Sequence, residues 1–107
     1  MRGEALKGHL DLLILAAVQP GPRHGYAIIE ELRRNSGGVF DLPEGTVYPA
    51  LHRLERAGLL ASKWSDHDGR RRRVYRLTRS GKAALSCDIE EWATFARAVA
   101  AVLGTTA

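Results

Sequence analysis

The C-terminal quarter of the sequence constrains the fold more than any other part. Between Thr78 and Leu103 it contains no proline, and a set of apolar residues recurs at spacings of 4, 3, 4, 3 and 4. This is the heptad pattern of a helix that packs along another helix. We therefore expect one long helix, capped by Thr78, which reaches beyond a small domain and packs against a second subunit. The seam comprises Leu85, Ile89, Trp92, Ala96, Val99 and Leu103, with Phe95 and Val102 on one flank.

Three shorter helices are expected before it. Residues 5–18 include LDLLILAAV, which is apolar on nearly every side and predicts a helix buried on more than one face. Its Leu10 and Ile14 are expected to pack against the last helix of a partner subunit. The second helix is expected over residues 24–35, where Ile28, Ile29 and Leu32 form the apolar stripe.

The third helix is expected in the segment EGTVYPALHRLERAGLL, residues 44–60, with Gly58 as its C-terminal cap. Val47, Leu51 and Leu54 follow helical spacing and predict the buried stripe. Pro43 suits the first helical position. Pro49 would kink the helix unless the regular part starts near Thr46.

A β-hairpin is expected next, with strands over residues 60–65 and 72–77 joined by the loop DHDG. The order of three helices, a hairpin and a long helix predicts a mostly α fold with a small β-hairpin. This is a winged helix-turn-helix followed by a C-terminal dimerisation helix. We expect residues 1–78 to form the DNA-binding domain and residues 79–107 the dimerisation helix.

Positive charge is concentrated in one third of the chain. Residues 44–79 contain nine Lys or Arg and four acids, whereas the rest contains seven bases and eight acids. A nucleic-acid-binding surface has this footprint, although a solvated basic face would give the same count.

The third helix and the hairpin carry side chains that suit DNA. With the apolar stripe inward, the outer face of a helix that a major groove can accommodate carries Tyr48, His52, Arg53 and Arg56. Arginine suits guanine edges, whereas tyrosine and histidine suit phosphates or single base contacts. The hairpin is expected to bind phosphates, and one or two of its arginines are expected to enter the minor groove. The residues concerned are Lys63, Arg70, Arg71, Arg72 and Arg73.

Three segments together resemble the PadR family of bacterial transcriptional regulators: HGYAIIEEL, EGTVYPALHRLERAGLL and GRRRRVYRLTRSGKAAL. The similarity covers about residues 8–103, and a single C-terminal helix resembles the short subgroup. It implies a homodimer that binds a palindromic operator in double-stranded DNA, usually as a repressor. It also places Tyr26 in the second-helix motif and implies recognition-helix contacts at Thr46, Tyr48, Pro49, His52 and Arg53.

Trp92 has two possible roles, plain packing in the seam or one wall of a ligand pocket. Some short members of the PadR family bind aromatic compounds at the dimer interface, so the resemblance implies a small aromatic effector. The expected lining residues are Leu10, Ile14, Asp88, Trp92, Phe95 and Ala96.

Other classes of function have little support in the sequence. The single cysteine, Cys87, rules out an intramolecular disulfide and fits a reducing cytoplasm, and the N-terminal apolar run is too short for a membrane span. The histidines lack metal-ligand spacing, and the sequence has neither a nucleophile elbow nor a glycine-rich phosphate loop. We therefore expect no metal, no cofactor and no enzymatic activity. The alternative is a winged-helix module that binds only proteins.

Overall fold

The computed structural model of the chain describes residues 6 and 8–106. These residues form four helices and a three-stranded antiparallel sheet, which confirms the mostly α fold with a small hairpin. In chain order the elements are α2 (Leu10–Val18), β1 (Arg23–His24), α3 (Gly25–Asn35), α4 (Glu44–Arg56), β2 (Leu60–His67), β3 (Arg70–Leu77) and α5 (Arg79–Leu103).

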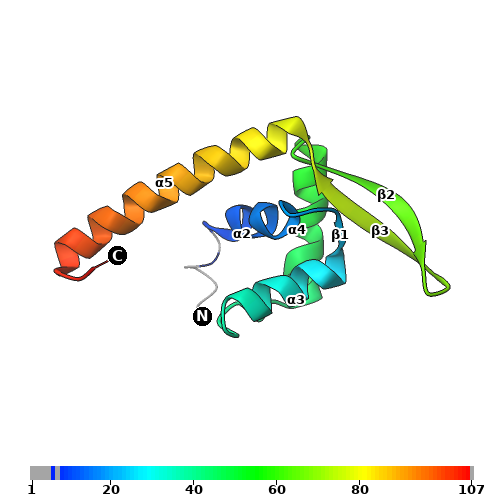
Figure 1. Cartoon of the computed structure of the whole chain (residues 1–107), viewed down its shortest axis with the longest axis horizontal. Coiled ribbons are helices and arrows are strands. Elements are labelled where there is room, and N and C mark those ends of the chain that lie inside the picture. The colour runs from blue at the N-terminus through cyan, green and yellow to red at the C-terminus, as the bar shows by residue number, and fades with distance from the viewer. Residues whose placement is uncertain (1–5, 7, 107) are drawn as a thin grey trace.

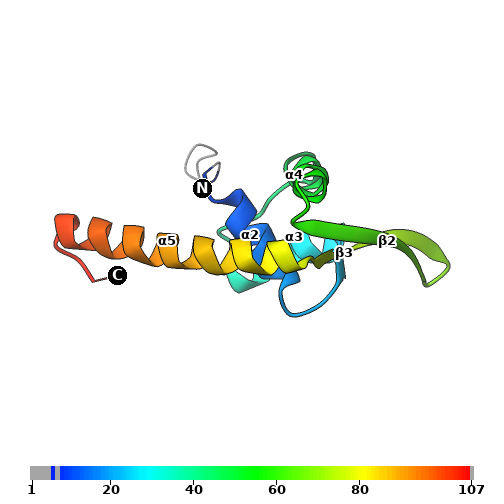
Figure 2. The same ribbon diagram turned by 90° about the horizontal axis from the view of Figure 1, so that it is seen from above.

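The molecule is elongated, with principal extents of 53 × 28 × 21 Å. Helix α2 lies at the centre, against α3, α4 and α5. The hairpin of β2 and β3 projects from one end of this body, and the last turns of α5 project from the other (Figure 1). The view from above shows α5 running along the body, with α4 seen nearly end-on (Figure 2).

The core forms where the apolar stripes of the helices meet the inner face of the sheet. The predicted stripe of α4 is confirmed, because Val47, Leu51 and Leu54 are all buried. Ile28 and Leu32 bury the inner face of α3. The sheet closes the core from the other side with Tyr75 and Leu77, whose shared face follows from strand alternation.

Helix α4 runs without interruption through Pro49, so its regular part starts at Glu44 and not near Thr46. Pro43 takes the N-cap position, one residue before the predicted place. Pro49 has no N–H, so the carbonyl of Gly45, four residues earlier, has no helical donor. The helix tolerates this because both residues are exposed and water can reach the Gly45 carbonyl. At the other end the predicted cap is confirmed, since Gly58 has φ +80° and Leu59 N–H donates to the Leu54 carbonyl at 3.0 Å.

The hairpin is longer and its turn tighter than the sequence predicted. Its turn has only two residues, Asp68 with φ +50° and Gly69 with φ +74°, so both strands extend to the tip. The sheet also gains β1, which the sequence did not predict, because His24 was expected to lie in the second helix and α3 starts only at Gly25. This strand pairs with β3, with Arg23 opposite Tyr75, and gives the order β1-β3-β2.

The first helix begins later than predicted. Gly8 and His9 form a turn, and α2 starts at Leu10. Residues 5 and 7 of the predicted helix lie outside the described residues. Within the described part of the chain, no helix combines the length and the apolar character needed to cross a bilayer.

Two residues predicted for a subunit interface lie in the core of the single chain. Ile14 is 0% exposed and Leu85 is 2% exposed, so neither has surface left for a partner in this conformation. Ile14 faces inward because α2 is enclosed by three helices, and Leu85 because the first turns of α5 close the core. These two positions are therefore corrected to core residues.

Candidate nucleic-acid interface

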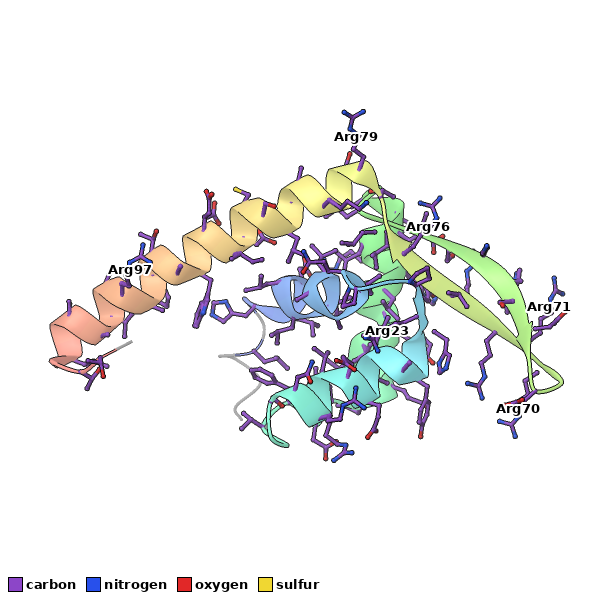
Figure 3. The ribbon with its side chains drawn as sticks, in the orientation of Figure 1. Arg23, Arg70, Arg71, Arg76, Arg79 and Arg97 are labelled. Atoms are coloured by element: carbon purple, nitrogen blue, oxygen red, sulfur yellow. The ribbon has the colours of Figure 1, made fainter. Side chains whose placement is uncertain are left out.

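A basic cleft of about 680 Å³ lies between the start of α3, helix α4 and the hairpin. All four consecutive arginines of the hairpin border it, opposite tyrosine and histidine side chains of the helices. Figure 3 shows Arg70 and Arg71 at the hairpin tip, pointing to opposite sides of it. The lining residues are His24, Gly25, Tyr26, Glu44, Tyr48, His52, Trp64, Arg70, Arg71, Arg72, Arg73 and Tyr75.

The cleft brings together seven of the eleven residues predicted to contact DNA. They are Tyr26, Tyr48, His52 and the arginines at positions 70–73. The other four lie outside it. Thr46 and Pro49 are on α4, and the exposed Lys63 pairs with Val74 in the sheet. Arg53 is also on α4, where it is engaged by Asp11 at the start of α2.

The start of α3 holds Tyr48 in the cleft wall. His24 caps this helix, since its Nδ1 accepts the Ala27 N–H at 3.2 Å. Gly25 then brings the backbone against the tyrosine ring, because a Cβ at this position would lie 2.7 Å from Cζ and Oη of Tyr48. The HGY motif therefore fits the close approach of α3 to α4.

We expect Gly25→Ala to weaken duplex DNA binding about fivefold, the cost of losing one well-placed hydrogen bond. The added methyl group pushes the tyrosine ring out of place, while the midpoint of unfolding changes little because the far end of a side chain can move. Binding titrations of both proteins check this. Gly21→Ala is the matched control, since nothing lies within 4 Å of a Cβ there. Equal DNA affinity of Gly25→Ala and the natural protein would contradict this role of Tyr48.

Trp64 is a cleft residue that the sequence analysis missed. Its side chain is 53% exposed, and the guanidinium carbons of Arg71 and Arg73 lie 5.1 and 5.3 Å from the ring centroid. Such cation–π contacts at exposed sites each contribute about 0.5–1 kcal/mol. The strand register explains the cluster, because Trp64 is directly opposite Arg73. Had the two strands been predicted to extend to a two-residue turn, their register would have placed Trp64 opposite Arg73 from the sequence alone.

Polar contacts fix the hairpin relative to α4. Ser62 Oγ donates to Glu55 Oε2 at 2.6 Å, and Arg73 Nε donates to Ser62 Oγ at 2.7 Å. Arg73 Nη2 also lies 3.6 Å from Glu55 Oε2. On the other side, Arg72 Nη1 lies 3.0 Å from His24 Nε2. Two of the four arginines are thus oriented by the elements that flank the cleft.

The electrostatics of the cleft suit a polyanion. A phenol is protonated at neutral pH, and burial, together with the charge of nearby Glu44, raises the pKa of Tyr48 further, so its hydroxyl is available as a hydrogen-bond donor. Four arginines and a phenolic donor along one cleft match the donor set that phosphate oxygens accept. Among the described residues, no group of three or more His, Cys, Asp or Glu side chains is arranged to hold a metal ion.

A second hollow of about 460 Å³ lies between the start of α2 and the middle of α5. Trp92 and Phe95 form an aromatic wall with His9, whose ring centroid lies 5.0 Å from that of Trp92. The lining residues are Gly8, His9, Asp11, Leu12, Asp88, Glu91, Trp92 and Phe95. Asp88, Trp92 and Phe95 of the predicted effector set are among them, whereas Leu10, Ile14 and Ala96 are not.

Carboxylates dominate the polar part of this hollow. Burial raises the pKa of Asp88, and the charges of Glu91 and Asp11 raise it further. Nearby Cys87 is exposed, and the negative charge of Glu91 raises the pKa of its thiol. A raised pKa disfavours the reactive thiolate, so Cys87 has the character of an inert surface thiol.

Comparison with known proteins agrees with the fold. Residues 14–87 match the Transcriptional regulator PadR-like family. A transcriptional regulator from Mycobacterium tuberculosis is 46% identical over 76 residues, which cover 71% of this chain and 68% of that protein.

Solved structures show the same architecture. A PadR family regulator from Eggerthella lenta is 31% identical with a TM-score of 0.82, and the match covers 96% of this chain and 88% of that one. A PadR family regulator from Clostridium difficile is 33% identical with a TM-score of 0.79, covering 90% and 99% of the two chains. The chain therefore belongs to the PadR-like family of transcriptional regulators.

Proposed function

We propose that this regulator binds a palindromic operator as a homodimer and acts as a repressor. The observation that carries the proposal is the basic cleft, which is lined by tyrosine and histidine side chains of the helices and by all four consecutive arginines of the hairpin. Helix α4 would enter the major groove with His52 near base edges. The hairpin arginines would neutralise phosphates and fix the orientation of the helix.

The dimer is proposed from the surface of α5. Beyond Leu85 this helix exposes a continuous apolar stripe along its length, and monomeric proteins seldom leave such stripes in water. Ala96 and Val99 continue the predicted heptad, and Leu10, half-buried at the start of α2, is kept as a proposed interface residue. In the proposed division, residues 1–78 bind DNA and residues 79–107 dimerise. The exposed stripe is Ile89, Trp92, Phe95, Val99, Val102 and Leu103.

A small aromatic effector is the second part of the proposal. The hollow beside Trp92 is continuous with the α5 stripe, so a partner helix would cover it in part. Its aromatic wall suits a flat apolar molecule, and the carboxylates of Asp11, Asp88 and Glu91 favour one with a positive charge. The effector must have different affinities for the two arrangements of the dimer, because only that difference can shift their populations. It would release the operator by changing the spacing of the two α4 helices, about 34 Å for adjacent major grooves.

Arg71→Ala tests the division of roles within the cleft. We expect it to weaken binding to operator and to random duplex equally, by about three- to tenfold, because a phosphate contact carries no sequence information. The slope of log K against log salt should flatten by about one unit. Binding titrations at several salt concentrations measure both quantities.

His52→Ala is the companion variant, because the His52 side chain lines the same cleft from the centre of α4. It should weaken operator binding more than random-duplex binding, with little change in the salt slope. Equal losses on both DNAs for this variant would contradict the proposal that α4 contacts base edges.

A further inference from the structure

Arg53 is joined to the first turn of α2 by a two-pronged ion pair. Nη1 donates to Asp11 Oδ2 at 2.9 Å, and Nη2 donates to Asp11 Oδ1 at 2.6 Å. Both carboxylate oxygens therefore hold the outer edge of the guanidinium, and the bond to Asp11 raises the pKa of Arg53. The pair connects residues 42 positions apart and is about half exposed, with 52% of the Arg53 and 43% of the Asp11 side chain open to solvent.

The position of Arg53 on α4 places it at the edge of the surface that would face DNA. Successive residues of a helix are about 100° apart, so Pro49, His52 and Arg56 share the outward arc opposite the buried stripe. Arg53 follows His52 on the flank that turns away from the hairpin. Its long side chain could reach either a DNA backbone or the start of α2, and in this structure it reaches α2.

The edge of the guanidinium that Asp11 holds is the edge that would bind DNA. A guanine or a phosphate is bound by two parallel N–H donors of arginine, and a carboxylate takes the same two donors. Arg53 therefore cannot offer that edge to DNA while the pair is intact.

From this geometry we infer that Asp11 is an affinity-determining residue, an internal carboxylate that competes with DNA for Arg53. The inference rests on the proposed function, since it assumes that α4 docks on a duplex. Asp11 also lines the hollow between α2 and α5. Whatever occupies that hollow therefore lies beside the acceptor that restrains Arg53, and a direct ion pair joins the wall of the hollow to α4.

The test is a double-mutant cycle of Asp11→Asn, Arg53→Gln and the double variant, with binding to the upstream DNA of the protein's own gene. Asparagine keeps the shape of aspartate but not its charge. An exposed ion pair contributes little, so releasing Arg53 by Asp11→Asn should tighten binding by about two- to fivefold. The slope of log K against log salt should steepen by about one unit, which corresponds to one additional phosphate contact. In the Arg53→Gln background the same change should have no effect.

Glu30→Gln is the matched control, because it removes an exposed carboxylate that pairs with Arg33 on α3 and raises the net charge equally. It should change DNA binding less than Asp11→Asn does. Thermal unfolding of each variant shows that the fold is kept.

Three results overturn the inference while leaving the proposed function intact. They are unchanged or weaker DNA binding by Asp11→Asn, a gain no larger than that of Glu30→Gln, and a gain that persists without Arg53. Failure of the natural protein to bind any duplex would instead overturn the proposed function, and the inference with it.

Discussion

Gly81→Ala is expected to destabilise the protein by about 3 kcal/mol, the upper range for overpacking a tight contact. A Cβ at this position would lie 2.0 Å from the carbonyl oxygen of Leu59 and 3.0 Å from its carbon. Both are backbone atoms, so no side-chain rotation can relieve the clash. For a domain of this size the loss corresponds to a fall in Tm of roughly 10–20 °C, which thermal unfolding measures at fixed protein concentration.

The clash would also open the joint between the hairpin and α5. The Leu59 carbonyl accepts the Thr78 N–H at 3.1 Å, and Thr78 Oγ1 donates to the Gly58 carbonyl at 2.6 Å. The same hydroxyl accepts the Gly81 N–H at 3.0 Å and caps α5. A methyl group on Gly81 would push these contacts apart together, which is why one methyl group should have so large an effect.

Gly45→Ala is the control for the Gly81 prediction. Gly45 also lies in a helix, but nothing is within 4 Å of a Cβ there. Alanine is a better helix former than glycine, so this variant should be as stable as the natural protein or up to about 1 kcal/mol more stable. A Gly81→Ala protein that unfolds at the temperature of the natural protein would contradict the described packing of α5 on Leu59.

Trp92→Asp is expected to abolish dimerisation at micromolar concentration. The tryptophan lies in the middle of the exposed α5 stripe, and an aspartate there would be buried without a partner in the dimer. We expect the dissociation constant of the dimer to rise by about 100-fold or more, as for central aromatic residues of interfaces. Sedimentation equilibrium measures this change directly.

Thr94→Asp provides the comparison on the opposite side of α5. Thr94 is exposed and lies about 150° around the helix from the centre of the stripe. The Thr94→Asp substitution adds the same charge to the same helix as Trp92→Asp, but it should leave the proposed dimer intact. Persistence of the dimer in Trp92→Asp, at the affinity of the Thr94→Asp protein, would show that the stripe is not the interface.

Local patterns were enough to predict the order and type of the main elements. The N-cap at Thr78, the cap at Gly58 and the stripes of α3 and α4 all follow from contacts between residues close in sequence, and the structure confirms them. The basic hairpin was also predictable, since alternation and a turn sequence define it locally. These features made the helix-and-wing arrangement predictable from the sequence, and with it most of the cleft.

Features that depend on long-range contacts were not predictable in the same way. Heptad spacing assigned Leu85 to the subunit seam, but the first turns of α5 pack on the body of the chain and bury it. The short strand β1 exists only because β3 offers it partners, with His24 opposite Val74. Arg53 has the pattern of an exposed α4 arginine, and only the fold brings Asp11 within reach of it.

The most direct test of the proposed function is DNA binding by the purified protein. Binding to a labelled fragment from upstream of its own gene is compared with a random duplex of equal length, at two salt concentrations. We predict tight binding that prefers the upstream fragment and weakens steeply with salt, because arginines of the cleft would displace counterions from the phosphates. No binding to either duplex at low salt would contradict the proposal and favour a winged-helix module that binds only proteins.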